Sequence, residues 1–259
     1  MTRLQNLFGK NKKRLLSVYF TAGYPTVDST GEIIKALANG GADMIEVGVP
    51  FSDPMADGKT IQESSTIALR NGMTLNRLLE QVAEVRPEVP ETPLVLMGYL
   101  NPMMHYGIER LFEKCHAIGI DALIIPDLPF ADYLRDFKPL CDRYSIPVIM
   151  LITPETSLER MLLIDAHCDG FIYVVSTAST TGTRDNFAPE QIEYFKSLNH
   201  LGLRNPRLIG FGISNKATFE AACNHSSGAI IGSKFIKCLT EHPTDPKAAV
   251  ASLISAINN

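Results

Sequence analysis

Short apolar runs, rich in β-branched residues, alternate with amphipathic stretches along the whole chain. The runs are continuously apolar rather than alternating, which is typical of parallel strands that are covered by helices. They are far shorter than the roughly 20 residues of a membrane span. Eight candidate strands follow from this pattern: residues 15–21, 43–49, 93–99, 122–126, 147–152, 170–176, 207–211 and 228–231.

The stretches between these strands have helical periodicity. Clear examples are residues 30–42, 107–120 and 132–146. In the third, Tyr133, Phe137, Leu140 and Tyr144 recur at spacings of three and four residues. A Gly or Pro before the next strand ends several of these stretches, as is usual for the loop between a helix and a strand. The amphipathic opening of the chain predicts a short N-terminal helix.

The number of strand–helix units favours one fold. Eight units fill the 259 residues without a linker or a low-complexity segment. This count and length predict an α/β protein with a single domain over residues 1–259, folded as a (β/α)8 TIM barrel. A doubly wound open sheet would also give β/α alternation and is the alternative.

In such a barrel the chemistry lies at the carboxyl ends of the strands and in the loops that follow them. That rule selects a small set of positions as candidates for the site. They are Tyr19, Glu46, the loop up to Asp57, Tyr99, Asp127, Tyr173, Gly212, Gly232 and Ser233.

Composition narrows the class of protein. Hydrophobic residues make up 45% and charged residues 20%, and the net charge of -4 gives no basic surface for nucleic acid. The N-terminus lacks the pattern of a signal peptide. The 5 cysteines are scattered without a C-x-x-C pair, which favours reduced, buried thiols over a zinc site or disulfides. We therefore expect a cytoplasmic protein that binds neither nucleic acid nor membrane.

Glycines at two neighbouring strand ends indicate a phosphate site. Gly210 and Gly212 lie at the end of the seventh predicted strand, and Gly232 with Ser233 follows the eighth and opens a helix. Glycine lets backbone N–H groups approach an anion, and the helix N-terminus adds a favourable dipole. Each glycine alone fits a tight turn equally well, but together they favour a phosphorylated small molecule as ligand.

The absence of some residue types excludes several chemistries that such barrels carry. No candidate strand contains the lysine of a Schiff-base aldolase. The six histidines fall in helices or loops rather than in a cluster of metal ligands, so we expect no metal. The sixth strand is followed by Ser176 and Thr177, where a triose isomerase would have its base. Carboxylate acid–base chemistry remains.

Glu46 is the leading candidate for that chemistry. The alternation of the second strand places Met44, Glu46 and Gly48 on one face. Burial on the inner face of a barrel would raise the pKa of the carboxyl and prepare it to donate a proton. Asp57, on the following loop, is the expected second carboxylate and would remain ionised. The alternative is a structural glutamate that forms a salt bridge outside the barrel.

Several segments carry a family resemblance. The segment "IEVGVPFSDPMADGKTIQ", residues 45–62, resembles the signature of the tryptophan synthase alpha chain family. The likeness extends over essentially the whole chain, through "VYFTAGYPT", "GYLNPMMHYG", "IIPDLPFAD", "GFGIS" and "IIGSKF". The segment at the second strand is highly specific, whereas the glycine motifs alone would be weak.

The resemblance implies a carbon–carbon lyase that splits indole-3-glycerol phosphate into indole and glyceraldehyde 3-phosphate. Glu46 and Asp57 match the catalytic carboxylates of the family, and Tyr173 matches a tyrosine beside the glutamate. Tyr19, Tyr99 and Asp127 would line the indole pocket, and Thr181 would position the aspartate. The remaining matched positions bind phosphate: Gly182, Gly212, Gly232 and Ser233. Residues 177–186 depart from the common family pattern, although Thr181 and Gly182 keep its Thr-Gly core.

The resemblance also implies a partner. Members of the family pair with a beta chain that carries pyridoxal phosphate, in an αββα tetramer that receives indole directly; this chain itself would need no cofactor. The expected contact surface consists of Pro50, Pro54, Met55, Pro102, Met103 and Met104. Two alternatives stay open. One is a stand-alone lyase that releases free indole, and the other is a silent barrel that only activates its partner, against which the Glu46 and Asp57 pair argues.

Overall fold

The eight strands close into a parallel barrel in the computed structural model, which describes residues 1–10, 12–176 and 186–259. Each strand pairs with the next along the chain, and β8 pairs with β1. The predicted TIM barrel is therefore confirmed, and the open sheet is wrong. That the chain forms a single domain over residues 1–259 stays a prediction. The strands are β1 Leu15–Thr21, β2 Met44–Gly48, β3 Leu94–Met97, β4 Ala122–Ile124, β5 Val148–Ile152, β6 Ile172–Val175, β7 Arg207–Gly210 and β8 Gly228–Ile231.

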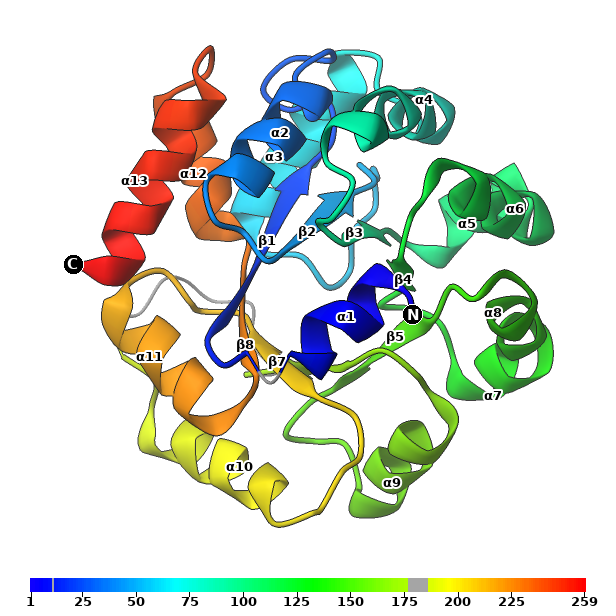
Figure 1. The fold of residues 1–259 in the computed structure, drawn as a ribbon, viewed down its shortest axis with the longest axis vertical. Coiled ribbons are helices and arrows are strands. Elements are labelled where there is room, and N and C mark those ends of the chain that lie inside the picture. Colours follow the sequence, from blue (N-terminus) through cyan, green and yellow to red (C-terminus); the bar gives the residue numbers. More distant parts are fainter. Residues whose placement is uncertain (11, 177–185) are drawn as a thin grey trace.

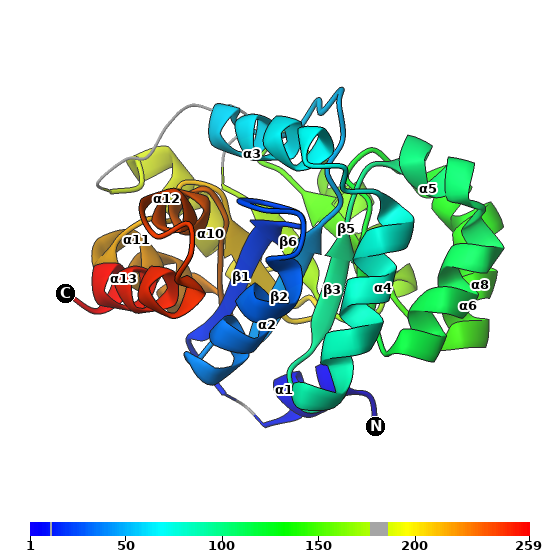
Figure 2. The same ribbon diagram turned by 90° about the horizontal axis from the view of Figure 1, so that it is seen from above.

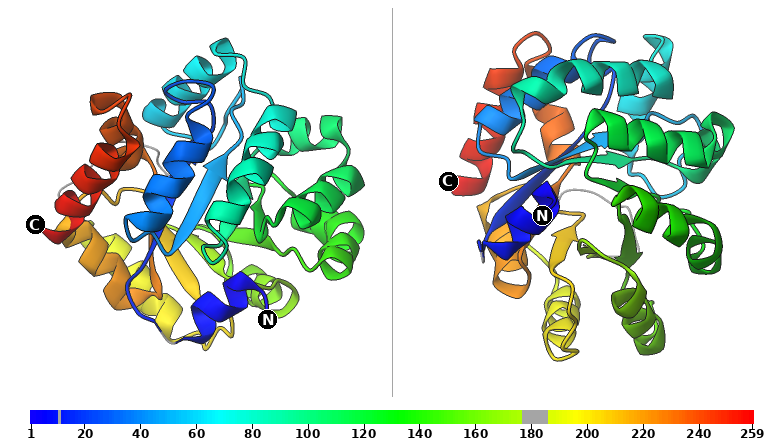
Figure 3. Two further views of the ribbon diagram at one scale, coloured as in Figure 1. Left: turned by 45° about the horizontal axis from the view of Figure 1, so that its top comes forward. Right: turned by 45° about the vertical axis from the view of Figure 1, so that its right-hand side comes forward.

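Helices form an outer ring around the strands, apart from the first, which lies across one end of the barrel (Figure 1 and Figure 3). In chain order they are α1 Arg3–Gly9, α2 Thr30–Asn39, α3 Lys59–Arg70, α4 Leu75–Val85, the 3-10 helix η1 Arg86–Glu88, α5 Leu100–Tyr106, α6 Ile108–Ile118, α7 Phe130–Asp132, the π-helix η2 Tyr133–Phe137, α8 Lys138–Tyr144, α9 Leu158–His167, α10 Pro189–Asn199, α11 Lys216–His225, α12 Ser233–Glu241 and α13 Pro246–Asn258. No helix among the described residues is long and apolar enough to cross a membrane.

The strand bounds differ from the sequence prediction by one or two residues, at either end of the strands. Only β1 and β8 have the predicted bounds, and the other strands are shorter. The excess is clearest at β3, predicted to reach residue 99, where the strand ends at Met97 and Tyr99 is the N-cap of α5. Apolar and aromatic residues continue past the last ladder hydrogen bond because the loops themselves fold over the barrel end. Apolar runs therefore overestimate strand length at this end.

Two of the three example helices are confirmed, by α2 and α6, and the third is interrupted. The predicted helix over residues 132–146 contains a π-helical turn, η2, between α7 and α8. Pro139 stands in the first turn of α8. Proline lacks an N–H and its ring clashes with the carbonyl four residues earlier, so a regular helix is not sustained through this segment.

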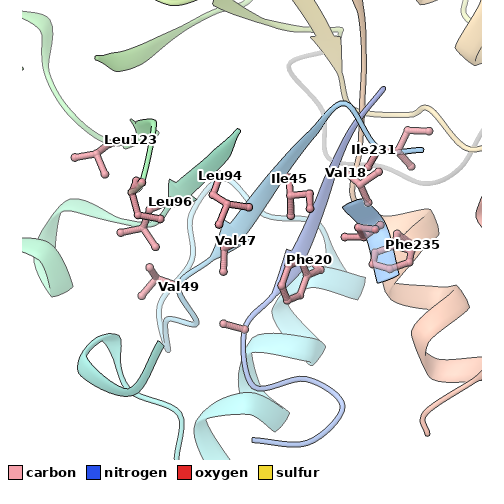
Figure 4. Packing of buried hydrophobic residues seen from close by; sticks show 14 of the residues in the cluster. Val18, Phe20, Ile45, Val47, Val49, Leu94, Leu96, Leu123, Ile231 and Phe235 are labelled. Carbon is pink, nitrogen blue, oxygen red and sulfur yellow. The ribbon is translucent and has the colours of Figure 1, made fainter. Parts of the chain in front are cut away.

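Two hydrophobic layers follow from the alternation of the strands. Outward-facing side chains, such as Val18, Ile45, Val47 and Leu96, pack between the strands and the helices (Figure 4). The inward-facing side chains form a separate cluster inside the barrel, which comprises Leu4, Leu15, Met44, Val95, Ala122, Ile124, Ile149, Phe171, Tyr173, Val175, Leu208 and Ile230. The inner cluster is the floor on which the candidate site rests.

Helix α1 closes the amino end of the barrel. It lies at the opposite end of the barrel from α3 (Figure 2). Thr2 and Gln5 cap its first turn reciprocally, Leu4 is only 2% exposed inside the inner cluster, and Phe8 packs on Phe171 with ring centroids 5.8 Å apart. The predicted N-terminal helix is thus confirmed, and it shields the barrel interior from water on this side.

A buried ion network fastens the same end. Asp121 accepts hydrogen bonds from the Leu94 N–H at 2.9 Å and from Arg3 at 3.1 Å, and one of its oxygens lies 3.6 Å from a guanidinium nitrogen of Arg86. Arg86 also donates to the Val89 and Thr92 carbonyls. Burial lowers the pKa of Arg86 to about 10, because desolvation disfavours its charge. Asp121 is therefore the counter-charge that holds α1 and η1 together.

The five cysteines are confirmed as buried small hydrophobes. All are free thiols and all lie in the outer layer, between barrel and helices: Cys115, Cys141, Cys168, Cys223 and Cys238. Burial raises the pKa of Cys115 to about 12, so this thiol stays protonated at neutral pH.

Replacing Asp121 with alanine should destabilise the protein strongly. The variant leaves the buried Arg86 guanidinium without its counter-charge and the Leu94 N–H without its acceptor, so we expect the free energy of unfolding to fall by about 3 kcal/mol. Urea unfolding measures the change. Asp142→Ala, which removes the exposed partner of Lys138, is the matched control and should cost less than about 1 kcal/mol. Equal costs for the two variants would contradict the role given to Asp121.

Candidate active site

Glu46 points into the barrel from β2. Its side chain is fully buried, and the Ser17 hydroxyl on β1 donates a hydrogen bond to Oε1 at 2.7 Å. The other oxygen, Oε2, has no hydrogen-bond partner among the described residues. Burial raises the pKa of Glu46 from 4.5 to about 7, against the smaller lowering effect of the Ser17 hydrogen bond. The predicted inward orientation and raised pKa are confirmed, and the alternative of a salt bridge outside the barrel is wrong.

Asp57 lies on the loop between β2 and α3, half-buried above the strands. The Tyr99 hydroxyl donates a hydrogen bond to its Oδ2 at 3.0 Å, and Gln62 donates to its backbone carbonyl at 2.7 Å. Burial raises the pKa of Asp57, while the bond from Tyr99 stabilises its charged form. Tyr99 thus donates a hydrogen bond to Oδ2 of the Asp57 carboxylate and not to its other oxygen.

Tyr99 organises that loop. Its hydroxyl oxygen accepts a hydrogen bond from the Ala56 N–H at 2.9 Å while its proton is given to Asp57. The ring packs on Phe51, with centroids 5.3 Å apart. Burial and the Asp57 charge raise the pKa of Tyr99, so the phenol keeps the proton that it donates. Tyr99 therefore sets the position of Asp57 through both the side chain and the preceding backbone.

Two buried tyrosines each pack against a glycine of the next strand. Tyr19 on β1 covers Gly48 on β2, and Tyr173 on β6 covers Gly210 on β7; a Cβ on either glycine would overlap the tyrosine hydroxyl. Burial raises the pKa of both tyrosines, and the Asp57 and Glu46 carboxylates raise it further. The effect of the two carboxylates on both tyrosines indicates that Glu46, Asp57, Tyr19 and Tyr173 lie near one another in one site.

The remaining predicted site residues fall at the same end of the barrel. The Asp127 carboxylate, after β4, accepts a hydrogen bond from the Leu100 N–H at 2.8 Å and so caps the start of α5. Gly212 follows β7 with a φ of +76°, a conformation that favours glycine. Gly232 is the N-cap of α12, and Ser233 is the first residue of that helix. Thr181 and Gly182 lie outside the described residues.

Two residues were not selected from the sequence. Ser17 lies two positions before Tyr19 on the inner face of β1, so strand alternation alone points to it as a second inward polar side chain. Phe211 has a φ of 69°, its carbonyl accepts the Ser176 hydroxyl at 2.7 Å, and its ring packs edge-on to Tyr173. Nothing in the sequence indicates a left-handed phenylalanine.

The expected partner surface is only partly exposed. The side chains of Met55 and Met104 are 82% and 60% exposed, which fits a contact surface. Met103 is fully buried and Pro50 is buried too, so their expected place on this surface is wrong. Both belong to segments that pack against the barrel: Met103 fills the inner side of α5, because a helix presents adjacent residues to different faces.

Among the described residues no group of three or more His, Cys, Asp or Glu side chains is arranged to hold a metal ion.

Replacing Glu46 with glutamine should stabilise the protein at alkaline pH. A raised folded pKa means that the buried acid favours folding below the unfolded pKa of 4.5 and that this contribution is lost as pH rises through about 7. Glutamine cannot ionise and keeps an acceptor for Ser17. We expect the stability gain over the native protein to grow by about 3 kcal/mol between about pH 5 and about pH 8. Urea unfolding at both pH values measures it, with exposed Glu113→Gln as the control; a gain that does not depend on pH would contradict the buried charge.

Comparison with known proteins agrees with this geometry. The family model of the tryptophan synthase alpha chain matches residues 4–259. The chain is 57% identical over 257 residues to the tryptophan synthase alpha chain of Parabacteroides distasonis, covering 99% of both chains. It is 50% identical over 242 residues to that of Flavobacterium psychrophilum, covering 93% of this chain and 95% of the relative.

Solved structures give the same answer. The tryptophan synthase alpha chain of Legionella pneumophila subsp. pneumophila superposes with a TM-score of 0.86 at 30% identity, over 99% of this chain and 96% of that one. The tryptophan synthase A-subunit of Pyrococcus furiosus gives 0.87 at 32% identity, over 95% and 98% of the two chains. Sequence and structure together show that the chain belongs to the tryptophan synthase alpha chain family.

Proposed function

We propose that this chain is a carbon–carbon lyase that cleaves indole-3-glycerol phosphate to indole and glyceraldehyde 3-phosphate. The observation that carries the proposal is the Glu46 carboxyl, buried on the inner face of the barrel with a raised pKa and one oxygen that has no hydrogen-bond partner in the part of the chain that the structure describes. A carboxyl of this kind is a general acid near neutral pH. Membership in the tryptophan synthase alpha chain family indicates the reaction in which this acid would act.

The reaction needs one group that moves a proton and one that stabilises positive charge. Glu46 donates its proton to C3 of the indole ring, and the ring becomes cationic. Its carboxylate then takes the proton of the glycerol hydroxyl next to the ring. As the C3–C1′ bond breaks, its electrons return to the ring and the hydroxyl carbon becomes the aldehyde. Asp57 accepts a hydrogen bond from the indole N–H and stabilises the cationic ring meanwhile.

The other residues of the site receive positioning roles in this proposal. Tyr173 and Tyr19 are neutral and buried beside the two carboxylates, where they would wall the indole ring. Tyr99 fixes Asp57. Asp127 holds the loop between β3 and α5 next to the pocket. Thr181 would position the aspartate, as the family resemblance suggests.

The phosphate of the substrate is assigned to the ends of β7 and β8. Gly212 adopts a conformation with positive φ, and Gly232 with Ser233 begins the nine-residue helix α12. Backbone N–H groups at the start of a helix attract an anion, and the absence of side chains at the glycines lets it come close. Gly182 belongs to the same proposed phosphate site through the family resemblance.

We further propose that the chain works with a beta chain that carries pyridoxal phosphate, in an αββα tetramer to which it passes indole for the synthesis of L-tryptophan. The exposed side chains of Met55 and Met104, on the loop after β2 and on α5, support a contact at the active-site end. The chemistry assigned to this chain uses carboxylates alone and needs no cofactor of its own. Its free, buried thiols fit a cytoplasmic enzyme.

Indole release from indole-3-glycerol phosphate tests the lyase. The native chain should release indole, with turnover falling as pH rises through about 7 because the protonated fraction of Glu46 falls. Glu46→Gln should lower kcat by at least about 100-fold, since the variant has no proton to donate. Glu113→Gln, an exposed change of the same kind, should leave kcat unaltered. Undiminished indole release by a folded Glu46→Gln protein would contradict this proposal.

Titration with a beta chain separates the partnered enzyme from a stand-alone lyase. With the beta chain and its remaining substrates present, tryptophan should form with little free indole. Met104→Asp should weaken binding of the beta chain by about tenfold in Kd, because it places a charge on the proposed contact. Isothermal titration calorimetry measures this Kd. Leu163→Asp, which places the same charge on an exposed leucine of α9, is the control. Free indole that accumulates equally with and without the beta chain would favour the stand-alone lyase.

A further inference from the structure

The hydrogen bond between Ser17 and Glu46 is the contact on which the acid depends. Ser17 is 1% exposed and Glu46 is 0% exposed, so the bond lies in the dry interior of the barrel. In the ladder between β1 and β2, Ser17 is level with Met44 and Tyr19 is level with Glu46. Ser17 therefore reaches Glu46 diagonally, from the floor side of the site, across 2.7 Å.

This contact makes the two carboxyl oxygens unlike. Oε1 accepts the serine proton, whereas Oε2 is buried without a partner among the described residues. A neutral carboxyl has one oxygen that accepts hydrogen bonds as a carbonyl and one that carries the proton. A hydrogen bond donated by Ser17 to Oε1 favours the carbonyl role for Oε1 and leaves the proton of the neutral acid to Oε2. The acid thus keeps its transferable proton on the oxygen that none of the described residues engages.

We propose that Ser17 is a positioning residue for the lyase reaction, which orients the Glu46 carboxyl so that Oε2 is the oxygen that exchanges the proton with the substrate. This inference rests on the proposed function of Glu46 as the acid. It adds that the acid has a fixed orientation, set by the preceding strand, and that a hydroxyl at position 17 is what fixes it.

The groups that face Glu46 leave this task to Ser17. Tyr19 on β1 and Tyr173 on β6 lie close enough for its charge to raise their pKa values, and Asp57 influences both from the loop above. The pKa of Glu46 itself is raised by burial and lowered by the Ser17 hydrogen bond. Removing that hydroxyl therefore removes the one side-chain hydrogen bond that the described residues give to the charged form.

Ser17→Ala, with Ser17→Thr as the conservative variant, tests the inference. We expect Ser17→Ala to raise the midpoint of the Glu46 titration by about one pH unit, because a hydrogen bond to a charged acceptor is lost. The Glu46 signal in a carboxyl carbon-13 NMR titration, assigned by its loss in Glu46→Gln, measures this without substrate. Threonine keeps the hydroxyl and should bring the midpoint back to the native value.

Kinetics supply the second readout. Ser17→Ala should lower kcat for indole release by about tenfold, leave KM within about twofold, and move the alkaline limb of kcat to higher pH. Ser252→Ala is the matched control, because it removes a serine hydroxyl that bonds to His242 on the C-terminal helices, outside the barrel interior. Ser252→Ala should leave the alkaline limb of the pH dependence of kcat unchanged.

The outcomes separate this inference from the function on which it rests. Native protein that releases no indole defeats the proposed function, while the carbon-13 titration still reports whether Ser17 controls the carboxyl. Native protein that is active, with an unmoved midpoint and an unmoved alkaline limb in folded Ser17→Ala, overturns the role of Ser17. Thermal unfolding establishes that each variant is folded; if threonine is too large for the interior, the alanine result decides alone.

Discussion

A carboxyl group lies buried in the interior of the barrel, and among the described residues its hydrogen-bond partner is a serine hydroxyl rather than a cation; this is the constraint on which the rest of the site depends. Desolvation of Glu46 costs folding energy at neutral pH, and the same desolvation raises its pKa to about 7. An arginine or lysine beside it would recover the energy but would also lower the pKa and remove the acid. The fold instead gives Glu46 the Ser17 hydroxyl and two neutral phenols, Tyr19 and Tyr173.

Asp57, the second carboxyl group of the site, has a different environment from Glu46. This difference is the basis for giving the two residues different proposed roles. Asp57 is only half-buried on a loop and receives a phenolic hydrogen bond from Tyr99, which stabilises its charge. Burial raises the pKa of both carboxyls, but Glu46 is fully buried and its pKa reaches about 7 despite the Ser17 hydrogen bond. Two groups of the same chemistry are thus separated by environment, one toward a proton donor and the other toward an anion.

The sequence predicts the barrel well because hydrophobic continuity and the strand–helix count are properties of the chain itself. The inward position of Glu46 follows from alternation in one strand, and the same reasoning applied to β1 would have found Ser17. The ends of the strands could not be predicted in this way, since Tyr99 is apolar enough for a strand but serves as a helix N-cap. The capping role of Asp127 and the left-handed Phe211 depend on contacts between different βα units, which no local pattern contains. The burial of Met103 reflects a short helix where a loop was expected.

The burial of Glu46 depends on contacts between the two ends of the sequence, through α1 and the pairing of β1 with β8. The floor of the barrel joins residues from both ends of the sequence: Leu4 and Phe8 pack with Phe171 and Leu208, and β1 meets β8 only after the last strand exists. The Ser17–Glu46 bond spans neighbouring strands and needs no such closure. The raised pKa of Glu46 comes from burial in the closed interior, and without that burial a glutamate has its ordinary pKa near 4.5. Proton donation near neutral pH is therefore a property of the completed barrel, acquired when the first strand meets the eighth.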